Sequence, residues 1–155
     1  MSFDLPDVIL GPGQGRTVHV PQHPITYKAR KEETRGAYAL LEAIVAGEGP
    51  PQHIHHAEEE AFYVLEGELN VQLGQRIVKG TAGSFILVPR GTVHTYWKVG
   101  SAPAKLLVLI SPPGFEQYFI DVVGDEEIDD MAAFIKRGMA VAQKYHLEIV
   151  GPPRG

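Results

Sequence analysis

Three histidines and one glutamate form the most chemically informative pattern in the sequence. His53 and His55 are separated by one residue, Glu60 follows shortly after them, and His94 comes much later in the chain. Residues i and i+2 of a β-strand face the same side, so a strand here would direct both imidazoles of the pair at one point. Imidazoles and a carboxylate without thiolate suit Fe, Mn, Ni, Cu or Zn and exclude a purely hard calcium site. The pattern therefore indicates a site for one divalent transition metal per chain.

An isolated His-x-His pair is more typical of a protein surface than of a metal site. The metal site therefore depends on strands and turns that bring Glu60 and His94 to the same place as the pair. A turn over residues 56–59 would reverse the chain, so that Glu60 opens the next strand and shares its interior side with Phe62 and Val64. His94 would arrive from a later strand, directly after a tight turn over residues 89–91. The four candidate ligands would then converge from three strands.

The rest of the chain favours an all-β domain. The 155 residues suit one domain, and 17 glycines and 12 prolines punctuate many short β-prone stretches. Residues 37–46 are predicted as a strand, although their composition also permits a helix. Such short, evenly spaced strands indicate an antiparallel sandwich or barrel.

Three segments are expected along the chain. Residues 1–15 form a flexible N-terminal arm, residues 16–114 the β-barrel, and residues 115–155 a C-terminal segment. In the last segment apolar residues recur at helical spacing, which predicts an amphipathic helix over about residues 125–146. Its apolar face would pack on the barrel or on a second subunit. Because that face and the exposed strand edges both need covering, we expect a homodimer.

Composition excludes several classes of partner. The formal net charge is -5 and cysteine is absent. No cluster of basic residues suggests nucleic-acid binding, and the longest uninterrupted apolar run, residues 106–110, is too short to span a membrane. The N-terminus lacks the basic and apolar regions of a secretory signal, so a cytoplasmic protein is expected. A small molecule remains as the expected ligand.

The spacing of fixed residues resembles the two motifs of the cupin superfamily. The first motif reads Gly47, five residues, His53, one, His55, four, Glu60, six, Gly67. After fifteen residues the second motif reads Gly83, five residues, Pro89, one, Gly91, two, His94. Nine of the ten usual positions are present, and Lys98 stands where the second motif usually ends in Asn.

The resemblance implies a jelly-roll-like antiparallel barrel of six to eight strands with His53, His55, Glu60 and His94 as metal ligands. Because the Asn that Lys98 replaces is not a ligand in the family, the metal site is not affected. The wider arrangement, with a trailing helix, is similar to single-domain bacterial cupins of the quercetin dioxygenase-like kind.

The interior side of the strands also predicts a ligand pocket. Phe62, Val64 and Tyr96 share the parity of the ligands, so they would form its wall, and Tyr96 would add a phenol near the metal. His19, His23 and His146 have no partner pattern and are expected to play no part in the site. A separate group in the turn, His56, Glu58 and Glu59, is expected to be solvated, unless one of them orients a ligand imidazole.

Three functions are compatible with such a site. The first is a metal-dependent dioxygenase acting on an enol, catechol or flavonol-like substrate, with Glu60 as the general base. The second is a redox-neutral isomerase or lyase in which the metal polarises a carbonyl. The third is a small-molecule-binding protein without turnover. All three need the same ligands, so the sequence does not choose among them.

Overall fold

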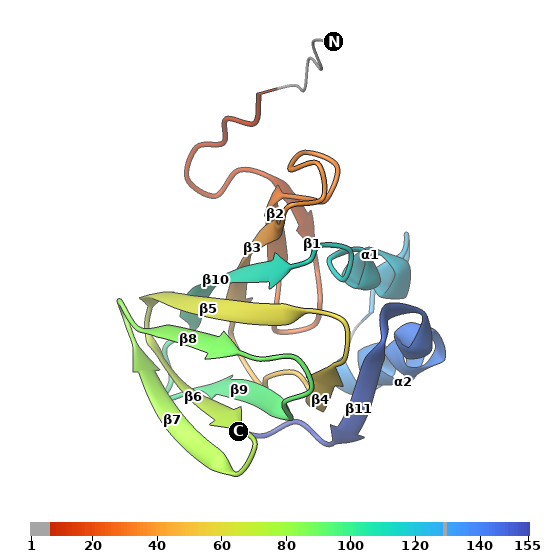
Figure 1. The fold of residues 1–155 in the computed structure, drawn as a ribbon. Coiled ribbons are helices and arrows are strands. Elements are labelled where there is room, and N and C mark those ends of the chain that lie inside the picture. Colours follow the sequence, from red (N-terminus) through yellow and green to blue (C-terminus); the bar gives the residue numbers. More distant parts are fainter. Residues whose placement is uncertain (1–6, 129) are drawn as a thin grey trace.

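Two antiparallel sheets face each other in the computed structural model, which describes residues 7–128 and 130–155. In this part of the chain one sheet has the strand order β1-β2-β3-β10-β5-β8 and the other has the order β11-β4-β9-β6-β7 (Figure 1). The strands are β1 (Arg16–Val18), β2 (Ile25–Ala29), β3 (Ala39–Val45), β4 (Gln52–His55), β5 (Glu59–Glu66), β6 (Glu68–Leu73), β7 (Arg76–Thr81), β8 (Phe85–Val88), β9 (His94–Lys98), β10 (Ala104–Ser111) and β11 (Leu147–Gly151). The all-β fold class predicted from the sequence is confirmed.

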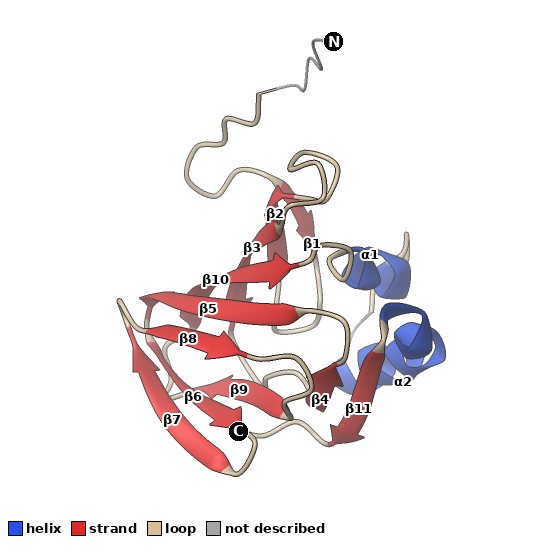
Figure 2. Ribbon diagram, in the orientation of Figure 1, coloured by secondary structure: helices blue, strands red, loops and turns tan. Residues whose placement is uncertain are grey.

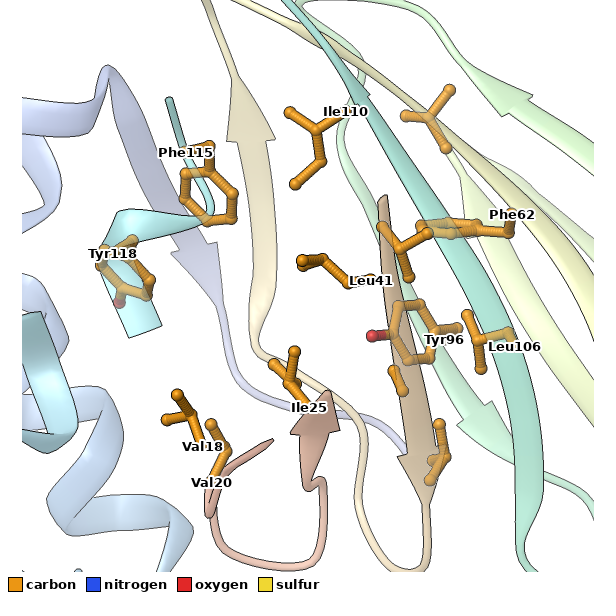
Figure 3. Close-up of a cluster of buried hydrophobic side chains, with 14 of the residues drawn as sticks. Val18, Val20, Ile25, Leu41, Phe62, Tyr96, Leu106, Ile110, Phe115 and Tyr118 are labelled. Carbon is orange, nitrogen blue, oxygen red and sulfur yellow. The ribbon is translucent and has the colours of Figure 1, made fainter. Parts of the chain in front are cut away.

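Alternating side chains place one face of each sheet in the core. In β3 every second residue from Ala39 to Val45 is buried, and β10 shows the same alternation. Phe62 from β5, Tyr96 from β9 and Leu106 from β10 meet between the sheets (Figure 3). The core is therefore the interior of the barrel, and Glu60 and His94 point into it on the same strands.

Two helices lie together on one side of the barrel (Figure 2). They are α1 (Gln117–Val123) and α2 (Met131–Val141), and a 3-10 turn (Ala142–Tyr145) links α2 to β11. Buried residues of both helices, including Tyr118 and Phe134, belong to the same apolar cluster as the barrel core. None of the helices in the described ranges is long and apolar enough to cross a membrane.

The helical segment is shorter than the predicted span of residues 125–146. Asp130 starts α2, because its side chain accepts a hydrogen bond of 2.7 Å from the Ala133 backbone N–H. After Val141 the helix tightens into the 3-10 turn, and this turn ends at His146, which adopts a left-handed conformation with φ 54°. These two end signals, rather than the apolar spacing, set the length of the helix.

The N-terminal arm is described only in part, because residues 1–6 lie outside the described residues. Residues 7–15 form no strand or helix and lead away from the barrel (Figure 1). Val8, Ile9 and Leu10 are exposed, so three consecutive apolar side chains stand free on this segment.

Candidate metal centre

Three strands from both sheets bring the four predicted ligands together. His53 and His55 lie on β4, His94 lies on the neighbouring β9, and Glu60 comes from β5 in the opposite sheet. His53 and His94 are directly paired in the strand register. All four side chains are buried, and one ligand atom from each lies within 4.8 Å of the others. The strand alternation thus builds a buried cluster that could hold a metal ion.

Each imidazole is held with its Nδ1 turned away from the centre of the cluster. His53 Nδ1 lies 2.6 Å from the Pro51 carbonyl, and His94 Nδ1 lies 2.9 Å from the Thr92 carbonyl. A carbonyl oxygen only accepts hydrogen bonds, so both Nδ1 atoms must carry the proton. The Nε2 lone pairs are then left for a metal ion, which is the usual arrangement of metal-binding histidines.

The Glu60 carboxylate faces two of these imidazoles. Its Oε1 lies 3.2 Å from His55 Nε2, and its Oε2 lies 3.1 Å from His94 Nε2. His55 Nε2 is buried without a hydrogen bond of acceptable geometry. Because Nδ1 of His94 already holds a proton, its Nε2 hydrogen-bonds Glu60 Oε2 only when a second proton sits between the two atoms. A metal ion is able to take the place of protons between these nitrogens and the carboxylate, so the donor set fits a metal ion.

The electrostatics of the cluster also favour positive charge at its centre. Burial alone would raise the pKa of Glu60, but His55 and His94 hold it well below its usual range. Burial would lower the pKa of His55, but Glu60 and Glu58 raise it to about 9. Burial and the two neighbouring imidazoles lower the pKa of His53 well below its usual value. The carboxylate therefore stays ionised, and protons and metal ions compete for the same place.

Of the three turn residues, Glu58 is not solvated and follows the stated alternative, in which one of them orients a ligand imidazole. It is buried, and its Oε1 lies 3.1 Å from His55 Nδ1. The turn folds Glu58 back under the strand that carries His55, so the carboxylate orients the imidazole as an outer partner of a ligand. His56 does remain exposed and pairs with Glu148 at 2.7 Å, while Glu59 is partly exposed.

An apolar cavity adjoins the cluster, and His53 and Glu60 form part of its wall. Phe62 and Tyr96 also line this cavity. Val64 does not line it, although it is fully buried in the core. The cavity has a volume of about 60 Å³, which is enough for a few water molecules or a small ligand fragment.

The C-terminal segment supplies a wall that the sequence did not assign. Phe115 packs against His55 with ring centroids 4.3 Å apart. Tyr118 of α1 and Phe134 of α2 continue the lining, and Leu147 of β11 is paired with His55. The helical spacing indicated an apolar face, but only the tertiary fold shows that this face covers the cavity.

His23 contradicts the expectation that it plays no part in the site. It lies in the loop between β1 and β2, is buried, and lines the cavity. Its Nε2 lies 2.9 Å from the Tyr96 hydroxyl. No local pattern marks this residue, because its place depends on how the loop folds across the barrel. In contrast, His19 and His146 lie on the surface.

Comparison with known proteins agrees with this fold and site. Residues 40–110, which hold all four candidate ligands, match the family described as Cupin domain. An uncharacterized protein of Methanocaldococcus jannaschii is 34% identical over 92 residues, which make up 59% of this chain and 69% of that protein. The chain belongs to the cupin superfamily.

One named enzyme and one solved structure are also similar to this chain. Quercetin 2,3-dioxygenase of Bacillus subtilis is 28% identical over 125 residues, which are 75% of this chain but only 36% of that enzyme. An RmlC-like cupin from Shewanella frigidimarina has a TM-score of 0.61 at 18% identity, over 72% of this chain and 96% of the other. At this identity the second similarity shows the fold alone.

Proposed function

We propose that the protein is a metal-dependent dioxygenase for a small, largely apolar substrate with adjacent oxygen donors, such as an enol, a catechol or a flavonol-like compound. One observation carries this proposal: the buried cluster of His53, His55, Glu60 and His94 opens directly into an apolar cavity. The similarity to a quercetin 2,3-dioxygenase adds support for this reaction class.

The number of protein ligands decides how a substrate would be held. Four ligands on an octahedral ion leave two adjacent or opposed positions for substrate, oxygen or water. A bound divalent transition metal would supply Lewis acidity and, if it is redox-active, access to oxygen chemistry. The apolar wall from Phe62 and Phe115 would exclude water and favour an aromatic or aliphatic body for the substrate.

Glu60 is the residue placed to accept the substrate proton. Its carboxylate is buried, lines the cavity and is held ionised by the neighbouring imidazoles. A carboxylate has two oxygens, so one is able to hold a metal while the other accepts a hydroxyl proton. The substrate would then become an anion in a site built for a positive ion, which stabilises that charge.

Metal content is the first test. We expect the purified protein to hold about one transition-metal ion per chain by elemental analysis. His53→Ala combined with His55→Ala should abolish retention, whereas His56→Ala should not, because His56 is exposed on the same turn. Full metal content in the double variant would overturn the assignment of the ligands.

Reaction class is tested next. Anaerobic addition of a catechol or flavonol to the Fe-loaded or Ni-loaded protein should change its absorption spectrum, and admitting air should consume oxygen. Glu60→Gln should keep much of the metal and lose most of the turnover, because an amide does not accept the proton. Spectral change without oxygen uptake would favour the redox-neutral isomerase or lyase, or the binding protein. No spectral change with any chelating compound would overturn the proposed substrate class.

A further inference from the structure

The cavity contains one polar pair that the metal site does not use. Besides His53 and Glu60, its lining is apolar apart from His23, Tyr96 and Tyr118. Tyr118 directs its hydroxyl toward Gly138 on α2, because a Cβ added at that glycine would meet the hydroxyl oxygen. His23 and Tyr96 instead bond to each other, with 2.9 Å between Nε2 and the phenol oxygen.

The His23–Tyr96 pair lies close to the candidate metal ligand His94. Tyr96 follows His94 by two residues on β9, so both side chains face the barrel interior and their Cα atoms are separated by about 7 Å. Phe62 lines the cavity beside both of them, since its ring centroid is 6.3 Å from that of His94 and 5.2 Å from that of Tyr96. A planar, ring-sized molecule would therefore reach from the metal to the pair along an aromatic wall.

Burying these two polar groups costs desolvation free energy, which their single mutual hydrogen bond offsets only in part. His23 and Tyr96 are only 4% and 7% exposed, and two phenylalanines would fill the same space without any polar group to desolvate. Burial lowers the pKa of His23 to about 4, so its ring is neutral at neutral pH and is able to accept the phenol proton. A phenol oxygen that donates to His23 still has lone pairs with which to accept a hydrogen bond.

We propose that His23 and Tyr96 form a second recognition point, which hydrogen-bonds a hydroxyl group at the end of the ligand remote from the metal. This inference rests on the proposed function, because it assumes that adjacent oxygens of the ligand occupy the metal. It narrows the ligand class to ring-sized chelators with a polar substituent opposite the chelating pair. An entirely apolar substituent leaves the phenol oxygen buried without that partner and binds less tightly.

Two catechols of nearly equal shape test the proposal. 4-(Hydroxymethyl)catechol carries a hydroxyl where 4-ethylcatechol carries a methyl group. Both are titrated by calorimetry under argon into Zn-loaded protein, since zinc is not redox-active and leaves the catechols unoxidised. We expect the wild type to bind the hydroxymethyl compound about two- to tenfold more tightly, which corresponds to one hydrogen bond.

Variants then assign the preference to the pair. Tyr96→Phe keeps the ring that packs on Phe62, and His23→Phe keeps a ring of similar size. In both variants the ratio of the affinities for the two catechols should fall to about one, because the hydroxymethyl group has lost its partner. Tyr118→Phe is the matched control, because this phenol lines the same cavity but points at α2. That variant should keep the preference.

The outcomes separate this inference from the proposed function. If both catechols bind equally well to the wild type, or if the preference survives in both variants, the recognition role is overturned while the metal-chelation proposal stands. If neither catechol binds better to Zn-loaded than to metal-free protein, the proposed function fails at the metal and the inference falls with it.

Discussion

His55 and Glu58 form a buried imidazole–carboxylate pair, with 3.1 Å between Nδ1 and Oε1. His55 belongs to the cluster of candidate ligands, Glu58 lies just outside it, and both side chains are buried. The carboxylate fixes the ring so that Nε2 faces Glu60, and it increases the electron density that the ring offers to a metal. A turn between two strands therefore contributes a residue to the metal centre.

Loss of this carboxylate should weaken metal binding without removing a ligand. We expect Glu58→Gln to lower the metal affinity about 10- to 100-fold, the usual effect of removing such an outer partner. A competition titration with a chromophoric chelator measures the change. Glu59→Gln is the matched control on the adjacent, partly exposed residue and should leave the affinity unchanged. Equal affinities of the two variants would show that Glu58 does not support His55.

Local alternation made much of the site predictable. Residues two apart share a side of a strand, so the sequence placed His53 beside His55 and Glu60 on the side of Phe62. The structure has the same parity, and the all-β class followed from the short strands between glycines and prolines. Such features depend only on neighbouring residues, so the amino-acid sequence predicts them.

The remaining features depend on contacts between distant segments. β11 is a short strand that pairs with β4 through Leu147 and His55, and no local pattern marked it. His23 reaches Tyr96 only because a loop 73 residues away in sequence folds across the barrel. Glu58 is buried because its turn folds inward, although a charged turn residue is usually solvated. Tertiary packing decided each of these cases.

Acid should destabilise the protein through His23. Burial lowers the pKa of this imidazole from 6.5 to about 4, although Glu60 partly opposes the shift. Between these two pH values the unfolded chain binds a proton that the folded chain does not, so stability is lost as pH falls from about 6.5 to about 4. The loss attributable to His23 is about 3 kcal/mol, at 1.36 kcal/mol for each pKa unit.

Urea unfolding of metal-free wild type and His23→Phe at pH 7.5 and 4.5 measures this loss. Lowering the pH from 7.5 to 4.5 should reduce the unfolding free energy of the wild type by about 2–3 kcal/mol more than that of the variant. His19→Phe provides the control, because His19 is exposed. A difference that is the same at both pH values would contradict the assignment.

Gly138 should be essential for the packing of α2 on α1. A Cβ at this position would collide with the Tyr118 hydroxyl oxygen and would lie 3.1 Å from its Cζ. Tyr118 is buried and stacked on Phe115, with ring centroids 5.1 Å apart, so its ring has little freedom to move. Overpacking costs about 1–3 kcal/mol, which exceeds the gain of up to about 1 kcal/mol from the helix propensity of alanine.

Thermal or urea unfolding of Gly138→Ala should therefore show lower stability than the wild type. Tyr118→Phe removes the hydroxyl with which the new Cβ collides, so combining the two substitutions should restore part of the loss. A single variant at least as stable as the wild type would show that the two helices are able to separate without cost.

The outer face of one sheet supports the last prediction, that the protein is a homodimer. Tyr63, Phe85, Leu87 and Leu109 form an outer-sheet patch on β5, β8 and β10, and each is at least 36% exposed. Tyr63 is paired with Phe85 in the register, and Ala61 connects Leu87 with Leu109, so the patch is continuous. Sheets pack face to face when both faces are apolar, and a second copy offers an identical face across a twofold axis.

Light scattering should give a mass about twice the 17.0 kDa of one chain at micromolar concentration. Phe85→Asp combined with Leu87→Asp places two charges on the patch and should produce a monomer. Both side chains point outward, so the variant should still unfold cooperatively in a thermal melt. Ile77→Asp is the matched control, because Ile77 is 53% exposed on β7 of the other sheet, and it should leave the mass unchanged. A wild-type mass near 17 kDa would refute the dimer, and a dimer that persists in the double variant would move the interface to another surface.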